Sequence, residues 1–399
     1  MPRLHSFSAL LPPANRAAQV ASVPYDTVST EEAAALAAER PYSFLHVVRP
    51  EIDLPPGTDP HGDEAHAQAR AALERLCRDS ILCRQATPTV FVYRMAAKGH
   101  RQIGVVGCCE VAEYESGLIR RHERTRPDKE DDRTRHIVAT RAHTEPVLLA
   151  YRDDSTVDDL VRCDTNERPL FHFLAPDGVT HTVWAVRDPE AYASAFAAAG
   201  PAWIADGHHR TAAAARAAET LGPGEAERFL SLLVPASQLR VLPYHRLVRD
   251  AGGRSSAELR RELSEIGPLR AVESPEPLER GSVAVLLGDQ WWRLELPQTA
   301  AAGTVEALDV ALLQEHVLRP VLGIEDPRTD ARLDFVGGSR GTQALEHAVR
   351  TGEAVAAIAM FPTSIEELMA IADAGGIMPP KSTWFDPKPR SGLFVHPFD

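Results

Sequence analysis

Eight consecutive residues combine the side chains best suited to chemistry in this chain: Trp203-Ile204-Ala205-Asp206-Gly207-His208-His209-Arg210. The apolar residues before Asp206 predict the end of a buried strand, and the alanine-rich stretch 211–221 predicts a helix. A strand that turns into a helix presents backbone N–H groups and the positive end of the helix dipole to a ligand. Helix capping explains Asp206 alone but leaves the two histidines and the arginine unexplained. The run therefore predicts a phosphate-binding corner at Gly207.

A second dense group of ionisable residues occupies positions 120–133. Its charges alternate in sign, so a solvated face laced with ion pairs is one interpretation. The other is a ligand site, because guanidinium and ammonium groups bind phosphate oxygens. The candidate phosphate contacts are the basic residues Arg124, Lys129 and Arg133. Glu130 and Asp131 are the candidate Mg²⁺ ligands, and His122 and Glu123 form a candidate acid/base pair.

A third group lies near the C-terminus, in the proline-rich stretch 378–388. Its candidate nucleotide or phosphate contacts are Lys381, Ser382, Thr383 and Lys388. The alternative interpretation is a C-terminal strap whose Trp384 and Phe385 fill a gap in the core. An earlier motif, Val23-Pro24-Tyr25-Asp26, reads as a turn, and its aspartate can face a pocket.

Composition excludes several classes of protein. The net charge of −13 argues against a nucleic-acid or anionic-membrane binder. No apolar run is long enough to span a bilayer, and the N-terminus lacks the features of a signal peptide, so we expect a cytoplasmic protein. The Walker, Rossmann and HExxH motifs are absent from the sequence. Cysteine spacing typical of a structural zinc site is also absent.

The predicted elements mix strands and helices without strict alternation, which favours an α+β fold of mixed sheets with flanking helices. The predicted helices cover residues 64–84, 211–221, 256–266, 305–322, 343–352 and 365–374. Hairpins are predicted from strands at 89–95 and 103–114, with a turn at 97–100, and at 171–174 and 180–186. Further strands are expected at 229–234, 241–248, 282–287, 291–296 and 354–361. A glycine- and serine-rich stretch after Asp250 predicts a boundary between a main domain (1–250) and a C-terminal α/β subdomain (251–399) whose terminal loop returns to the site.

The motifs together resemble the bacterial and archaeal family known as domain of unknown function 1015 (DUF1015). Five motifs, in order along the chain, carry this resemblance: Val23 to Asp26, Phe44 to His46 with Arg49 to Glu51, His122 to Thr125 with Lys129, Glu130, Asp132 and Arg133, Ala205 to Arg210, and Pro380 to Thr383 with Phe385, Pro387 and Lys388. The resemblance extends over nearly the whole chain.

The Asp-Gly-His-His-Arg corner is also similar to that of free-serine kinases in the ParB/sulfiredoxin-like superfamily. This resemblance implies a nucleotide phosphate on the N–H groups after Gly207, contacts from His209 and Arg210, and Asp206 near the reacting hydroxyl. Sulfiredoxins carry a reactive cysteine where His208 stands, so reduction of sulfinic acid is not expected. ParB-type proteins carry a Glu-Arg-Arg pattern there and DNA-facing basic charge, neither of which is evident in this chain.

The function expected from these features is phosphoryl transfer to a small hydroxylated metabolite, with free L-serine as the acceptor, ATP or ADP as the donor and Mg²⁺ as cofactor. Asp206 or Glu123 would then orient and deprotonate the hydroxyl. One alternative is a phosphatase acting on O-phosphoserine, with His208 or His122 as nucleophile or acid. The other is a regulatory protein that binds nucleotide without turnover. The sequence leaves open whether the chain forms a homo-oligomer.

Overall fold

The computed structural model describes residues 2–97, 99–276, 278–298, 301 and 303–398. The chain forms two compact units. Unit 1 comprises Met1–Arg121, Thr125–Leu239 and Pro387–Asp399, and unit 2 comprises His122–Arg124 and Arg240–Asp386. The second segment of unit 1 therefore ends at Leu239, whereas the boundary predicted from the sequence follows Asp250.

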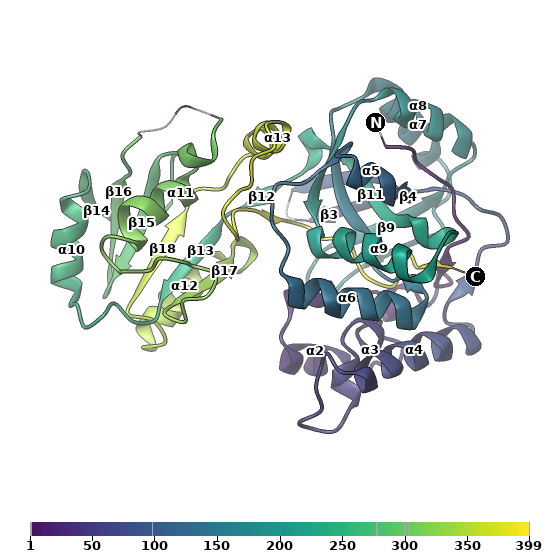
Figure 1. Ribbon diagram of the computed structural model, residues 1–399, viewed down its shortest axis with the longest axis horizontal. Helices are drawn as coiled ribbons and strands as arrows, with labels where there is room; N and C mark the ends of the chain where they lie inside the picture. The colour runs from purple at the N-terminus through teal and green to yellow at the C-terminus, as the bar shows by residue number, and fades with distance from the viewer. Residues whose placement is uncertain (1, 98, 277, 299–300, 302, 399) are drawn as a thin grey trace. The chain divides into compact units, whose positions relative to one another are not determined.

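Unit 1 is built on an eight-stranded mixed sheet (Figure 1). Its strands, in spatial order, are β5 (Ile119–Arg120), β10 (Ala202–Asp206), β7 (Val147–Tyr151), β11 (Arg228–Pro235), β4 (His100–Glu110), β3 (Phe91–Ala97), β9 (Thr180–Ala185) and β8 (Phe171–Leu174). The β10–β5 and β11–β7 pairs are parallel and the other pairs are antiparallel. Two short antiparallel pairs accompany the sheet, β1 (Leu10–Leu11) with β2 (Cys83–Arg84) and β20 (His396–Pro397) with β6 (Ala142–His143).

Helices cover the sheet of unit 1. They are α1 (Ala17–Val20), α2 (Thr30–Ala37), α3 (Leu45–Val48), α4 (Asp63–Arg78), α5 (Val111–Glu115), α6 (Pro127–Thr140), α7 (Ser155–Thr165), α8 (Pro189–Ala198) and α9 (His208–Leu221). Short 3₁₀ turns lie at Tyr25–Thr27, Pro50–Asp53, Glu225–Glu227 and Ala236–Gln238. Every residue of β7 is buried, as expected of a central strand covered on both faces. Figure 1 shows α6 and α9 side by side, and the two helices are in contact.

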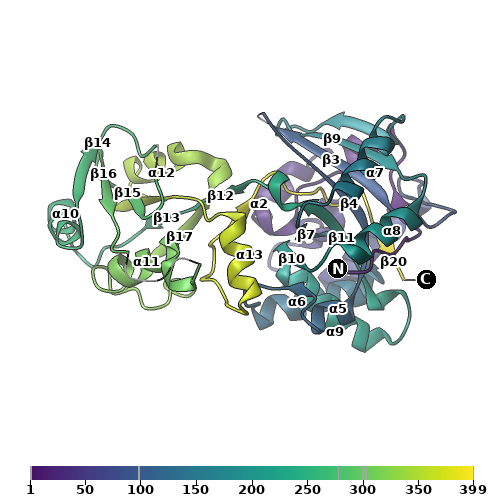
Figure 2. The same ribbon diagram turned by 90° about the horizontal axis from the view of Figure 1, so that it is seen from above.

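Unit 2 contains a six-stranded antiparallel sheet. Its strands, in spatial order, are β14 (Leu269–Val272), β16 (Gln290–Glu295), β15 (Ser282–Leu287), β18 (Ala356–Met360), β13 (Tyr244–Val248) and β17 (Leu333–Gly337), and β12 (Val241–Leu242) pairs separately with β19 (Trp384–Phe385). Its helical segments are α10 (Ser256–Ser264), α11 (Asp309–Leu313), α12 (Gly341–Arg350) and α13 (Ile365–Asp373), with short turns at Val305–Ala307, Gln314–Leu318 and Gly338–Arg340. Figure 2 shows α12 and α11 on opposite sides of these strands. Leu345 and Ala348 of α12 pack on Ala357 and Ala359 of β18.

The α+β class with mixed sheets and flanking helices is confirmed. Both predicted hairpins form, although Lys98, in the turn of the first, lies outside the described residues. The helix expected to reach residue 84 ends at Arg78, because Ser80 adopts a left-handed φ of 55° and the N–H groups of Ile81 and Leu82 turn back to the carbonyl of Leu76.

Two other predicted elements are interrupted. The strand expected at 241–248 is divided by Pro243, which has no N–H to give to a ladder. The helix expected at 305–322 is a 3₁₀ turn, a short α-helix and a π-turn, because Leu308 is extended and Pro320 follows. The helix predicted from Thr211 begins three residues earlier, at His208. Among the described residues, no helix has both the length and the apolar character needed to cross a bilayer.

Candidate phosphate-binding site

The strand-turn-helix corner forms as the sequence predicts. The buried strand β10 ends at Asp206, Gly207 turns the chain, and α9 begins at His208. Gly207 has a φ of 105°, a conformation that only glycine adopts without strain. A Cβ there would lie 3.0 Å from Nε of Arg210, so the glycine also makes room for that guanidinium. Gly207, at the N-cap position, has no side chain to cap α9, and the positive end of the helix dipole favours a negatively charged group at this end.

Asp206 holds two cations at this corner. One carboxylate oxygen accepts a hydrogen bond from Arg210, one helical turn further on, and the other accepts from Lys388 of the C-terminal segment. All three side chains are largely buried, with exposed fractions of 17%, 8% and 11% for Asp206, Arg210 and Lys388. Burial raises the pKa of Asp206, but the Lys388 ammonium and the Arg210 guanidinium outweigh it and hold the pKa below its ordinary value. We call Asp206, Arg210 and Lys388 the cation clamp.

A buried carboxylate that the sequence analysis missed lies beside the clamp. Glu145 accepts hydrogen bonds from the hydroxyl of Ser391 (2.6 Å) and the backbone N–H of Tyr25 (3.2 Å). Burial raises its pKa, and the positive charge of Arg210 opposes that rise. Arg210 in turn donates to the backbone carbonyl of Pro146. The only signal in the sequence was an isolated acidic residue directly before a proline and a fully apolar strand.

Residues near Glu145 also include the Val-Pro-Tyr-Asp motif. The Arg133 guanidinium lies over the Tyr25 ring, 4.3 Å from its centroid, and Asp26 is exposed on the same turn. A cavity of about 20 Å³ is lined by Arg133, Glu145 and Arg210, among others, which is room for about one water molecule. This cavity is therefore too small to hold a nucleotide or a metabolite.

The second half of the charged segment, from Pro127, lies on α6, which packs against α9. Arg133 is buried and pairs with the neighbouring carboxylate of Asp132 (2.7 Å). Lys129 lies half-buried in the first turn of α6, and Arg124 is exposed. Their proposed contacts to phosphate stay predictions.

The two carboxylates predicted to bind Mg²⁺ face a basic residue of α9. Glu130 accepts a hydrogen bond from Thr125 and lies 3.6 Å from Arg216, and Asp131 pairs with the same guanidinium. This arrangement explains the alternating charges of the segment as ion pairs that join α6 to α9. Magnesium binding by Glu130 and Asp131 stays a prediction.

His209 holds the start of α6 against the corner. Its Nε2 accepts a hydrogen bond of 3.1 Å from the backbone N–H of Arg126. An accepting Nε2 carries no proton, so this contact requires the neutral imidazole with its proton on Nδ1. His209 thus positions the loop before α6.

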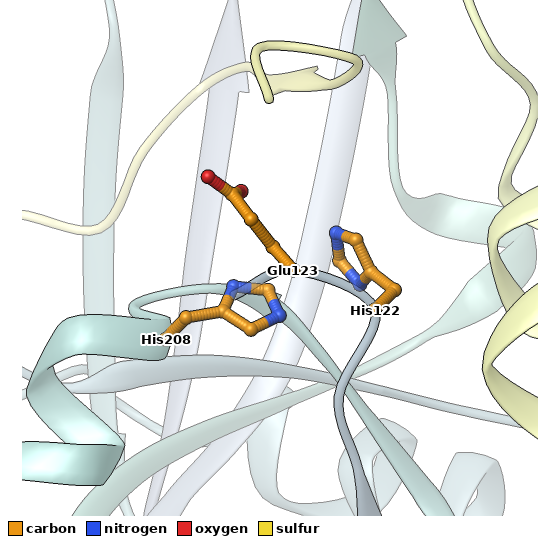
Figure 3. A group of neighbouring side chains, drawn as sticks. All are labelled: His122, Glu123 and His208. Carbon is orange, nitrogen blue, oxygen red and sulfur yellow. The ribbon is translucent and has the colours of Figure 1, made fainter. Parts of the chain in front are cut away.

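Three side chains distant in sequence provide a group of metal-ligating atoms. His122 and Glu123 precede α6, and His208 is the first residue of α9; one ligand atom from each lies within 4.8 Å of the others (Figure 3). Two imidazoles and a carboxylate suit a transition metal such as Zn²⁺ better than Mg²⁺, which prefers oxygen ligands. Motif spacing did not reveal this group because the fold, not a local pattern, brings it together.

The predicted residues Lys381, Ser382 and Thr383 belong to unit 2. Lys381 is exposed, with a left-handed φ of 57°, and its ammonium lies 5.1 Å from the centroid of the Tyr244 ring. The Ser382 hydroxyl donates to the carbonyl of Pro379 (2.6 Å), which closes a tight turn. The alternative interpretation of this region as a strap is confirmed for Phe385, which is fully buried, whereas Trp384 is half-buried.

The family of this sequence follows from its match to a family description. The family "Protein of unknown function (DUF1015)" matches residues 4–311, well over half of the 399 residues. The chain belongs to the DUF1015 family. The match includes four of the five motifs that carried the resemblance, and the motif at 380–388 lies beyond it. Comparison with curated proteins gave no match.

Several solved structures are similar to this DUF1015 chain. A C-terminally truncated SbnI from Staphylococcus aureus is 14% identical, with a TM-score of 0.40 over 73% of this chain and 87% of that one. A free serine kinase in complex with AMP is 15% identical, with a TM-score of 0.36 over 73% of this chain and 89% of that one. A variant of a free serine kinase in complex with ADP is 14% identical, with a TM-score of 0.35 over 73% and 90%. At this level of similarity the function has to be argued from the residues of the site.

Proposed function

We propose that unit 1 binds the phosphate groups of ATP or ADP at the first turn of α9 and transfers a phosphoryl group to the hydroxyl of a small metabolite, with free L-serine as the acceptor. The observation that carries this proposal is the cation clamp. It places an arginine and a lysine beside a helix N-terminus whose N-cap residue is a glycine. Phosphoryl transfer depends mainly on positioning and on neutralising the charge of the transferred group, which these groups can do.

The clamp suggests a division of roles among its members. Arg210 and Lys388 contact phosphate oxygens, and the N–H groups that follow Gly207 point at the same anion. Asp206 orients the two cations, because both its oxygens are engaged and its low pKa makes it a weak base. Removal of the hydroxyl proton is therefore assigned to Glu123, a half-buried carboxylate on the segment before α6. A divalent cation, when bound, would neutralise phosphate charge.

The test uses purified full-length protein in two parallel reactions with a divalent cation. One contains L-serine with ATP or ADP, the other contains O-phosphoserine alone, and serine and phosphoserine are quantified by mass spectrometry. We expect phosphoserine that depends on nucleotide in the first reaction. Lys388→Met and Arg210→Met should each lower this rate by roughly 100-fold or more, as removal of one stabilising donor does in other active sites.

The matched control is Arg70→Met in α4. Arg70 also pairs with a carboxylate four residues away, Glu74, but on an exposed surface, so its loss should leave turnover unchanged. Release of serine from O-phosphoserine without nucleotide would indicate that the protein is a phosphatase and not a kinase. Nucleotide binding without turnover in either reaction would indicate a regulatory protein. No nucleotide binding at all would overturn the proposal.

A further inference from the structure

Unit 2 contains a buried cation that the proposed function does not use. Arg246, in the middle of β13, is only 3% exposed. Its neighbours across the sheet are Phe335 of β17 and Ile358 of β18, both apolar. The guanidinium lies 4.6 Å from the centroid of the Phe335 ring. A charge in such a place loses its hydration and needs a compensating anion.

The hydrogen bonds of Arg246 do not supply that anion. Its guanidinium donates to the backbone carbonyls of Tyr244 (2.7 Å) and Lys381 (3.3 Å), and its Nε has no acceptor among the described residues. Burial lowers the pKa of Arg246 to about 9, and only Tyr244 opposes this shift. Within the described part of the chain, no carboxylate is paired with it.

The other buried arginines show how unusual this is. Arg133 pairs with Asp132, Arg210 with Asp206, and Arg390 with Asp177. Arg246 is thus the one buried arginine, among the described residues, whose guanidinium meets only neutral groups. A buried guanidinium without a negatively charged partner favours the binding of an anion, because the anion compensates its positive charge.

The surroundings of Arg246 provide a second cation. Lys381, whose carbonyl accepts the long bond from Arg246, is exposed and has no ion pair among the described residues. Its left-handed backbone is unusual for a lysine, and strain of this kind concentrates at functional sites. The rings of Tyr244 and Trp384, 5.2 Å apart and both half-buried, stand next to it.

We propose that Arg246 and Lys381 form an anion site in unit 2 that binds a phosphate group. The bound phosphate accepts from Nε of Arg246 and from the Lys381 ammonium, and Arg246 gives up its long bond to the Lys381 carbonyl. This proposal does not rest on the phosphoryl transfer proposed above, because Arg246 and Lys381 are not members of the cation clamp.

The experiment measures thermal unfolding and binding by calorimetry on the full-length chain carrying Lys388→Met, which removes one of the two side chains proposed to bind phosphate at the clamp. Inorganic phosphate and ADP are compared with acetate at equal ionic strength. Phosphate should raise the unfolding temperature where acetate does not. Adding Arg246→Met should abolish this rise and weaken phosphate binding at least tenfold. In phosphate-free buffer the same substitution should raise the unfolding temperature, because it removes an uncompensated buried charge.

Two further variants make the result decisive. Arg249→Met changes an exposed arginine near β13 that already pairs with Asp334 and Glu353, so its response to phosphate should equal that of the parent. Lys381→Met lies on the surface and should weaken phosphate binding severalfold even if Arg246→Met fails to fold. ADP binding more tightly than phosphate would identify a nucleotide as the source of the phosphate group. An equal response to acetate, or a phosphate response that survives both Arg246→Met and Lys381→Met, would overturn the proposal.

Discussion

The cation clamp shows why a single carboxylate can be indispensable without being a base. Asp206 compensates two buried cations, so its removal leaves both charges in a poorly solvated place. We expect Asp206→Ala to lower the free energy of unfolding by about 3–5 kcal/mol, the range for breaking buried ion pairs. Urea denaturation of the full-length chain measures this change.

An exposed pair of the same spacing provides the comparison. Arg70 and Glu74 are separated by four residues, as are Asp206 and Arg210, but their side chains are 61% and 54% exposed. Glu74→Ala should lower the free energy of unfolding by no more than about 0.5 kcal/mol. Equal effects of the two substitutions would mean that the clamp is no stronger than a surface ion pair.

At the scale of elements, the backbone at Gly207 is the feature most open to test. Gly207→Ala forces a side chain onto a φ of 105° and brings a Cβ within 3.0 Å of Arg210. Gly222, which ends α9, has a φ of 80°, and a Cβ added there would meet no atom within 4 Å, so Gly222→Ala reports backbone strain alone. We expect backbone strain to lower the free energy of unfolding by about 1–2 kcal/mol in either variant.

The difference between the two alanine variants isolates the effect on the clamp. Gly207→Ala should also displace the Arg210 guanidinium and reduce nucleotide affinity, which isothermal calorimetry would measure. Gly222→Ala should leave that affinity unchanged, because it lies at the other end of α9. If both variants bind nucleotide as the parent does, Arg210 does not contact phosphate.

Local patterns predicted the corner, both hairpins and the capped helix that begins after Ser364, because these depend on neighbours in the sequence. They could not predict contacts made across long separations. Lys388 reaches Asp206 across 182 positions, and Ser391 reaches Glu145 across 246. The order of the strands in each sheet was inaccessible for the same reason, since strand pairing is non-local.

At the scale of the whole molecule, the C-terminal residues 387–398 tie the site to the far edge of the sheet in unit 1. Arg390 donates from Nε to Nε2 of His181 on β9 (3.1 Å) and from its backbone to the Tyr93 hydroxyl (3.3 Å), and it pairs with Asp177 in the β8–β9 hairpin. His181 contacts the Tyr93 hydroxyl through Nδ1 (2.8 Å). These contacts hold the same segment that carries Lys388 into the clamp.

His181 makes this attachment sensitive to acid. Its Nε2 accepts from Arg390, so the neutral imidazole is required, and burial together with the Arg390 charge lowers its pKa to about 3. Below a pH of about 6.5 the unfolded chain binds a proton at this residue and the folded chain does not, so stability falls as the pH falls toward 3. Each such histidine contributes a slope of about 1.4 kcal/mol per pH unit over that interval.

His181→Gln should therefore remove about 1.4 kcal/mol per pH unit from the dependence of unfolding free energy on pH between about 6 and 4. The variant is expected to be less stable than the parent at pH 8, where the lost contacts count in full, and to approach or exceed the parent's stability at pH 4.5. Tyr93→Phe is the control, because it removes the hydroxyl partner but leaves the titrating imidazole. Its slope should match the parent's, and an unchanged slope in His181→Gln would show that His181 does not couple the C-terminal segment to pH.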